Sequence, residues 1–238
     1  MTLTKRAIPF VLTLLLLTIT AKTLSAQNLQ IHYDHNRQCI TSTVEMFRPD
    51  SFGSTYFFVD MDFQPKMTGT LWKIIRELCF WNNTPWECLS IQLHYTGGLH
   101  LDKGSFNNAF MTGLTYSWKS DDRLRTWSLS AVYKYIPGTI GLDGNPSVHN
   151  FQLSGNWKIE FLKKWCTFNG FVTFWKEARP WFNSDYVFLS EPQFWVNLNK
   201  IPGWDNVHLS IGTEVELSVN YFSQGFAYCP TAAVKWTF

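Results

Sequence analysis

Apolar and polar residues alternate along most of this chain, in segments of roughly ten residues separated by turn-forming residues. The clearest segment runs from Phe151 to Phe161, where every second residue is apolar or glycine and those between are polar or charged. Similar alternation recurs over 89–96, 127–135 and 207–219. Because successive side chains of a strand point to opposite faces, the pattern predicts β-strands with one apolar and one polar face.

Segments of this kind occur about twelve times along the chain. They are 29–33, 40–48, 54–63, 70–81, 87–97, 108–118, 125–136, 148–161, 165–176, 185–198, 206–220 and 228–238. The ambiguous one is 70–81, because Leu71, Ile74, Ile75 and Leu78 also fit the apolar face of a helix. We assign it to a strand.

The last segment alternates between apolar even positions from Tyr228 and mostly polar odd positions from Cys229, and it ends on Phe238. A strand that closes a barrel in the bacterial outer membrane needs an apolar outer face, with aromatic residues at the membrane interface. The alternative is the last strand of a soluble, exported β-sandwich.

Composition favours the membrane barrel. After residue 26, no stretch has the ~18 consecutive apolar residues of a spanning helix. A closed barrel is the other way to satisfy backbone polar groups in lipid. Aromatic residues make up 17% of the chain, with 12 Trp, which suits girdles at two membrane interfaces. We therefore predict an all-β, transmembrane, antiparallel β-barrel of about twelve strands in the cell outer membrane.

The two termini should lie on the same side of the membrane, because the predicted number of strands is even. Tight turns are expected at 48–53, 119–123 and 162–164, as in periplasmic hairpins. Longer links rich in Gly, Pro and Asn alternate with them and would be the outer loops. They are 137–146, 177–185 and 221–227. This arrangement predicts periplasmic termini.

The N-terminal residues predict an exported protein. Lys5 and Arg6 precede an apolar run over 7–21, and Ala26 precedes Gln27. This pattern is typical of a secretory signal peptide, so we expect a signal at 1–26 and a barrel at 27–238. The signal holds three basic residues and no acidic one, which leaves 17 basic against 18 acidic residues. Nucleic acid is therefore not an expected partner.

Five cysteines are an odd number for an exported chain. Cys79 and Cys88 flank one predicted periplasmic turn, so a disulfide between them is geometrically feasible in an oxidising periplasm. The alternative is that both are reduced thiols that act as small apolar residues. Cysteine and histidine spacings match no zinc pattern, and we expect no metal and no cofactor.

If the apolar faces meet lipid, the polar faces line a lumen. The side chains expected to line it and to contact a solute are Tyr56, Phe58, Asp60, Asp62, His94, Lys134, Lys158, Glu160, Phe171, Trp175, Glu191, Trp195, Glu214 and Glu216. Because buried charges must be hydrated or paired, they imply either a wet, narrow channel or a lumen closed by its own ion pairs. Aromatic faces beside hydrogen-bonding groups suit a flat, polar solute such as a nucleobase or a sugar. Alternatively, each of these residues is a structural side chain that fills the lumen and binds no solute.

Several segments carry a family resemblance. They are Leu29–Tyr33, Ser54–Asp62, Trp72–Phe80, and the pair Ala109–Trp118 and Thr126–Tyr135. With them the chain resembles the Tsx-like nucleoside-specific outer-membrane channels, and it is similar to an uncharacterised branch of Gram-negative outer-membrane barrels. The resemblance implies a monomeric twelve-strand barrel with a keyhole-like pore that passes nucleosides by diffusion. It also supports the strand at 70–81.

Three classes of function follow. The favoured one is a channel for passive diffusion of a small polar solute, with nucleosides as candidates. The second is a structural or adhesive barrel with a blocked lumen and no transport. The third is an outer-membrane enzyme, for which His208 and Ser210 share a strand face. A hydrolase needs a nucleophile, a base and a group that orients the base, and no third residue is identifiable here. We therefore expect no enzyme.

Overall fold

A computed structural model gives the fold for residues 26–81, 83–101 and 104–238. The predicted signal peptide, 1–26, lies outside these described residues except for Ala26, which begins the first strand. The strands are β1 (Ala26–Asp34), β2 (Cys39–Asp50), β3 (Gly53–Phe63), β4 (Met67–Leu78), β5 (Leu89–His100), β6 (Gly104–Lys119), β7 (Arg125–Tyr135), β8 (His149–Phe161), β9 (Cys166–Arg179), β10 (Ser184–Ser190), β11 (Gln193–Asn197), β12 (Leu209–Val219) and β13 (Phe226–Thr237). Two short 3-10 turns, η1 (Pro180–Phe182) and η2 (Leu198–Lys200), lie in links.

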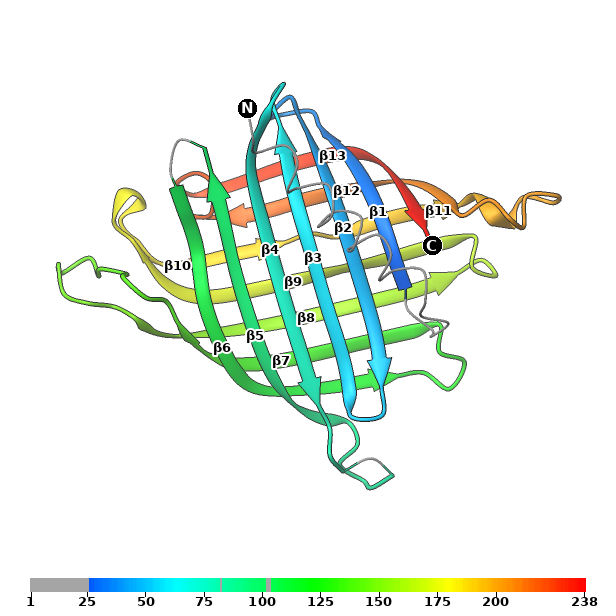
Figure 1. Ribbon diagram of the computed structural model, residues 1–238, viewed down its shortest axis with the longest axis horizontal. Coiled ribbons are helices and arrows are strands. Elements are labelled where there is room, and N and C mark those ends of the chain that lie inside the picture. The colour runs from blue at the N-terminus through cyan, green and yellow to red at the C-terminus, as the bar shows by residue number, and fades with distance from the viewer. Residues whose placement is uncertain (1–25, 82, 102–103) are drawn as a thin grey trace, which may run out of the picture.

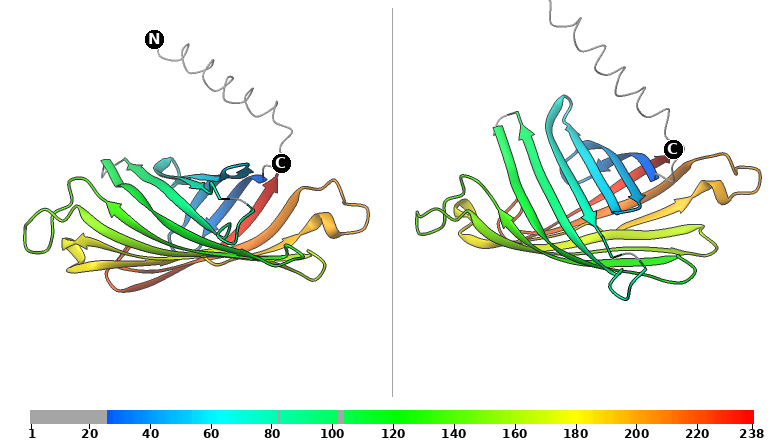
Figure 2. Two further views of the ribbon diagram at one scale, coloured as in Figure 1. Left: turned by 90° about the horizontal axis from the view of Figure 1, so that it is seen from below. Right: turned by 60° about the horizontal axis from the view of Figure 1, so that its bottom comes forward.

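The sheet closes on itself, because β1 pairs with both β2 and β13 and every strand is antiparallel to its neighbours. The ribbon accordingly curves around an interior, with β2–β4 across from β7–β9 (Figures 1 and 2). The predicted antiparallel barrel is confirmed. A soluble sandwich of two stacked sheets is not what the chain forms.

Thirteen strands occupy twelve positions in the barrel, because β10 and β11 share one place between β9 and β12. They are separated at Glu191 and Pro192. Proline has no backbone N–H, so it interrupts the ladder of a strand. Backbone pairing continues beside the break, where the Glu191 N–H donates to Phe171 O at 3.0 Å and Val215 N–H donates to Pro192 O at 3.0 Å.

The ambiguous segment at 70–81 is a strand, β4. The register of β4 with β3 shows which of its residues share a face. Lys73 pairs with Phe58, and Leu71 pairs with Asp60, so these side chains share one face. Ile74 lies on the other face and is 50% exposed. No helix among the described residues is long and apolar enough to cross a membrane.

The outer face of the barrel is an apolar belt. Leu129 is 58% exposed, Leu114 is 56% exposed, and they are cross-strand neighbours of other apolar residues. A row of tryptophans flanks the belt on the side of the termini, where Trp118 pairs with Trp127 and Trp127 with Trp157. Exposed apolar surface on this scale needs lipid, and aromatic girdles mark its interfaces. The barrel is therefore that of an outer-membrane protein.

Both termini lie at one end of the barrel, because Asn28 at the start of β1 pairs with Thr237 at the end of β13. The expected division between tight links on this side and long links on the other is only partly right. The turns after Asp50 and at 162–165 are tight, but the links at 79–88 and 198–208 at the same end are long. The opposite end also has short links, at 35–38 and 64–66. Link length therefore does not mark a side here, and the periplasmic location of the termini stays a prediction.

The apolar belt yields a stability prediction. We expect Leu129→Arg in the middle of β7 to lower the free energy of unfolding in lipid by about 2–4 kcal/mol, because it places a charge in hydrocarbon. The matched change Leu101→Arg, in the exposed link after β5, should cost about 0–1 kcal/mol. Urea unfolding in phospholipid vesicles would measure both. Equal costs at the two positions would mean that Leu129 does not face the bilayer core.

Candidate functional site in the barrel lumen

A contact between opposite walls identifies the inner face. Lys73 Nζ lies 5.0 Å from the ring centroid of Phe58 on β3 and 4.8 Å from that of Phe171 on β9. Strands β4 and β9 are not paired, so this lysine reaches across the lumen. Residues that share a face with these three therefore point inward, on the parity predicted from the sequence.

The acidic residues of β3 are held by threonines of β2. Thr43 donates its hydroxyl to Asp60 at 2.5 Å, and Thr41 donates to Asp62 at 2.7 Å. Tyr56 and Phe58 extend the same inner face, with their rings edge to face at 6.2 Å. The four predicted residues of this strand thus lie on one side of the lumen.

Glu191 lies at the break between β10 and β11, where the ladder of that wall is interrupted. It is in electrostatic range of Lys73, Asp60, Glu214 and Glu216, which come from three other strands. The break in the wall thus places a carboxylate in the middle of the lumen.

A second group surrounds Glu214 on β12. Gln193 Nε2 donates to Glu214 Oε2 at 2.5 Å, and His32 Nδ1 lies 3.8 Å from Glu214 Oε1. Gln193 Oε1 in turn accepts from Trp195 Nε1 at 3.0 Å. This network joins β1 to β11 and β12 on the inner face, across β13.

Trp195 is fully buried, at 0% exposure, and Lys235 Nζ lies 4.0 Å above its ring. The indole packs over Gly212 of β12. A Cβ at Gly212 would lie 2.1 Å from the backbone oxygen of Phe194 and 2.7 Å from Trp195 Cε3, so a larger residue would displace both the neighbouring strand and the ring. The glycine makes the room in which the tryptophan lies flat against the wall.

Trp195 pairs with the start of β9, whereas Trp175 lies toward the end of that strand. Phe171 lies between these two levels. Lys134 Nζ is 4.4 Å from the Trp175 ring, and Trp175 Nε1 donates to Glu177 at 2.6 Å. Glu177 also pairs with Arg179 at 3.1 Å. Two buried tryptophans thus bound the middle of the lumen, one toward each end.

The middle zone of the lumen is partly accessible to water although protein surrounds it. Asp60, Asp62, Lys73, Glu191 and Glu214 are all half-buried, unlike the closed-in tryptophans above and below them. Charged side chains in such a zone must be hydrated, paired or bound to a solute. The middle of the lumen, here called the central chamber, is therefore polar and partly accessible to water, and it lies between two levels at which tryptophans are buried.

Three predicted residues lie apart from this chamber. Lys158 and Glu160 pair with each other at 3.0 Å, near the end of the barrel that carries the termini. His94 is buried in the β5 wall, where its Nδ1 is 3.4 Å from Gln92. These residues belong to the inner face, but they are not next to the acidic group.

Sequence reasoning missed two basic residues of the lumen. Lys73 lies on the segment whose helical or strand periodicity was ambiguous, so its face could not be assigned. Arg37 lies in the turn at 35–38, where no alternation exists to place it. It bonds Asp34 at 2.5 Å and Glu216 at 3.3 Å, and it lies 4.8 Å from the Phe222 ring. Burial disfavours the charged guanidinium, but the two carboxylates outweigh this effect and raise the pKa of Arg37.

The remaining candidates of the sequence have plain structural places. All five cysteines are free thiols; Cys79 Sγ lies 3.8 Å from Glu87 O, and Cys88 Sγ lies 3.9 Å from Pro85 O. Ser210 donates to Asn197 at 2.8 Å, and the His208 ring lies 6.1 Å from that of Trp236. Ser210 and His208 thus have different partners. Within the described ranges, no His, Cys, Asp and Glu group could hold a metal ion.

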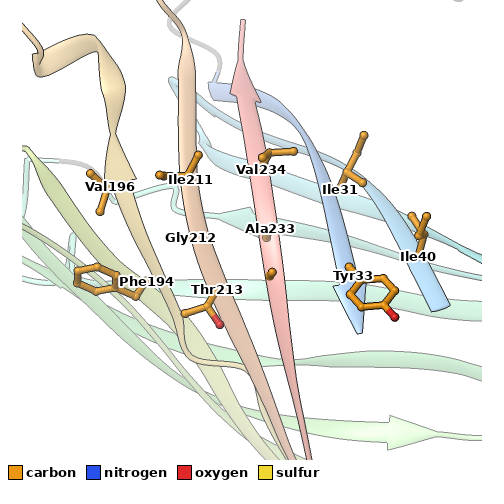
Figure 3. Close-up of a pocket in the computed structure, with 11 residues that line it drawn as sticks. Ile31, Tyr33, Ile40, Phe194, Val196, Ile211, Gly212, Thr213, Ala233 and Val234 are labelled. Atoms are coloured by element: carbon orange, nitrogen blue, oxygen red, sulfur yellow. The ribbon is translucent and has the colours of Figure 1, made fainter. Parts of the chain in front are cut away.

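A groove of about 650 Å³ lies on the outer face over β1, β2 and β11–β13 (Figure 3). Side chains such as Ile31, Tyr33, Phe194 and Ile211 rim it, and small residues of β12 and β13 form its floor. The rim belongs to the apolar outer face, so the groove is a feature of the lipid-facing surface and not of the solute path.

Comparison with protein families gives one match, to a family described as a domain of unknown function, DUF5020, over residues 26–238. The chain belongs to this family. A search of curated proteins finds no match.

Among solved structures, the NanC porin has 9% sequence identity and a TM-score of 0.58, with 90% of this chain and 99% of that chain covered. The outer membrane channel DcaP of Acinetobacter baumannii has 11% identity and a TM-score of 0.42, over 84% of this chain and 63% of that one. At these identities the likeness to NanC concerns the fold alone.

The turn at Arg37 yields a second stability prediction. We expect Arg37→Met to lower the free energy of unfolding by about 1–2 kcal/mol, because the buried Asp34 carboxylate loses its charged partner and keeps only the hydrogen bond from the backbone N–H of residue 37. The estimate is modest because the arginine side chain is 38% exposed and so partly screened by water. Arg123→Met, in the exposed turn after β6, is the control. Heat-modified mobility on gels would report both, and equal midpoints would rule out a stabilising role for Arg37.

Proposed function

We propose that this protein is an outer-membrane channel through which a small polar solute diffuses passively. The observation that carries the proposal is the half-buried, charged chamber in the middle of the lumen. A barrel that served only as a scaffold would gain more from an apolar or fully paired interior, since hydrated charges inside a wall add little stability. The likeness of the fold to that of a porin supports the same reading.

Nucleosides are the candidate solutes that the chamber fits best. Tyr56, Phe58 and Phe171 offer aromatic faces at the level of Asp60 and Glu191. A nucleobase could stack on such a face, and its ring nitrogens and ribose hydroxyls could bond the acidic and amide groups nearby. Selectivity would come from lumen width, stacking and hydrogen bonds, without energy input. We expect a monomer.

A second function has one observation in its favour. Lys73 crosses the lumen to Phe171, and Trp175 and Trp195 are buried in the interior toward the two ends. A barrel blocked in this way would not transport, and would act through its outer loops as a structural or adhesive element. The measurement that separates the two functions is permeation.

Liposome swelling with nucleosides, sugars and amino acids tests the channel. We expect swelling with solutes of nucleoside size, and we expect Asp60→Asn/Asp62→Asn to change the relative rates by at least about twofold, since it removes charge and leaves width unchanged. Asp121→Asn, in the exposed turn after β6, should leave the rates unchanged. No swelling by folded protein with any solute would favour the blocked barrel. Equal rates for wild type and the double variant would remove Asp60 and Asp62 from the solute path.

A further inference from the structure

Uncharged donors hold most of the carboxylates around the central chamber. Gln30 Nε2 donates to Glu45 at 2.8 Å, as Thr43 and Thr41 do to Asp60 and Asp62 and as Gln193 does to Glu214. The lysine and arginine ion pairs found in the described part of the chain involve other acidic groups. They are Asp34, Asp50, Glu160, Glu177 and Glu216. The hydrogen bonds from neutral groups fix the carboxylates without neutralising them.

These acidic groups also lie within electrostatic range of one another. Asp60 is near Asp62 and Glu45, and Glu191 is near Glu214, Glu216 and Asp60. Crowded like charges in a confined space are costly unless a proton or a cation compensates them. Glu216, which is 5% exposed, pairs with Arg37 through Oε2 at 3.3 Å and keeps Oε1 without a hydrogen-bond partner among the described residues. The chamber therefore favours positive charge.

The protein's own lysines show how the chamber holds positive charge. The Lys73 ammonium lies over the Phe58 and Phe171 rings and is in range of Glu191 and Asp60. Lys235 repeats the arrangement over Trp195, in range of Glu45. An aromatic face combined with a carboxylate is the usual protein environment for an ammonium ion. Both lysines behave as ammonium ligands tethered to the wall.

We propose that the central chamber is a binding site for organic cations with primary ammonium groups, and that Lys73 is its tethered occupant. This inference rests on the proposed channel function and adds a second solute class, organic cations, to the nucleosides proposed above. An entering amine takes the place of the Lys73 ammonium between the two rings, and the long, flexible lysine stem lets that side chain swing aside. The carboxylates of Glu45, Asp60, Asp62 and Glu214 then favour cations along the path and repel anions.

Planar-bilayer recordings of the full barrel test the inference. In a KCl gradient we expect the wild type to prefer K⁺ over Cl⁻ by at least about threefold, as a ring of carboxylates does in cation channels. Lys73→Met removes the tethered cation at similar length and should raise the preference further. Asp60→Asn/Glu214→Gln should bring it close to unity. Lys66→Met and Asp121→Asn, in exposed links, are the matched controls and should behave as wild type.

Block by an amine tests binding directly. We expect 1,4-diaminobutane to reduce the current through the wild type, and 1,4-butanediol, which is uncharged and of similar length, to have no such effect. Lys73→Met should lower the blocking concentration about tenfold, since the site loses its internal competitor, and Asp60→Asn/Glu214→Gln should raise it. The comparison of diamine with diol needs no variant, so it holds even if a variant does not fold.

Each outcome has a distinct meaning. Anion preference, or diamine and diol acting alike on a conducting wild type, would overturn the cation site and leave the channel standing. Diamine block that neither variant alters would remove Lys73 and the two carboxylates from the site and so overturn the inference. No conductance from wild type that shows heat-modified mobility would instead contradict the channel function, and this inference with it.

Discussion

The structure depends on the pairing of β1 with β13. Lipid offers no hydrogen bonds to a backbone, so every strand in a bilayer must have a partner on both sides. The pairing of β1 with β13 gives the first and last strands their second partner, from Asn28 with Thr237 to Asp34 with Thr231. Because side chains alternate, closing the sheet also sorts them: every second residue meets lipid and the rest are confined together inside. The apolar belt and the charged chamber are therefore two results of one constraint.

Confinement explains the character of the interior. A lumen bounded by twelve strand positions brings together residues that are far apart in the sequence, as Lys73 and Phe171 show. At the end of the barrel opposite the termini the chain pairs charges, at Arg37 and at Arg179. In the middle it uses threonine and glutamine to hold carboxylates in place. A chamber with that pattern holds charge in fixed positions without ion pairs that would stabilise the barrel.

The sequence predicted the barrel because strand alternation is a local signal that survives without knowledge of neighbours. The acidic and aromatic residues of β3 were placed on the inner face from that signal alone. Lys73 was not, because its segment fits two periodicities and only the register with β3 resolves them. Arg37 was missed because turns have no alternating faces. The break at Pro192 was also missed, since a proline inside an apolar segment can mark a bend, an edge or an interruption, and pairing on both sides decides which. Alternation along one strand gives the face on which a residue lies, and contacts across the lumen depend on the closed barrel.

The fit of Trp195 over Gly212 has a consequence for how such barrels can diverge. At that level the wall contributes bare backbone, and a single indole takes up the space. The filling of the interior at this level is thus separate from the architecture: exchanging the indole for a smaller side chain would open space beside Gly212, while the pairing of β11 with β9 and β12 rests on the backbone and would stay as it is. A single position can therefore reshape the inside of such a barrel without a change to its wall.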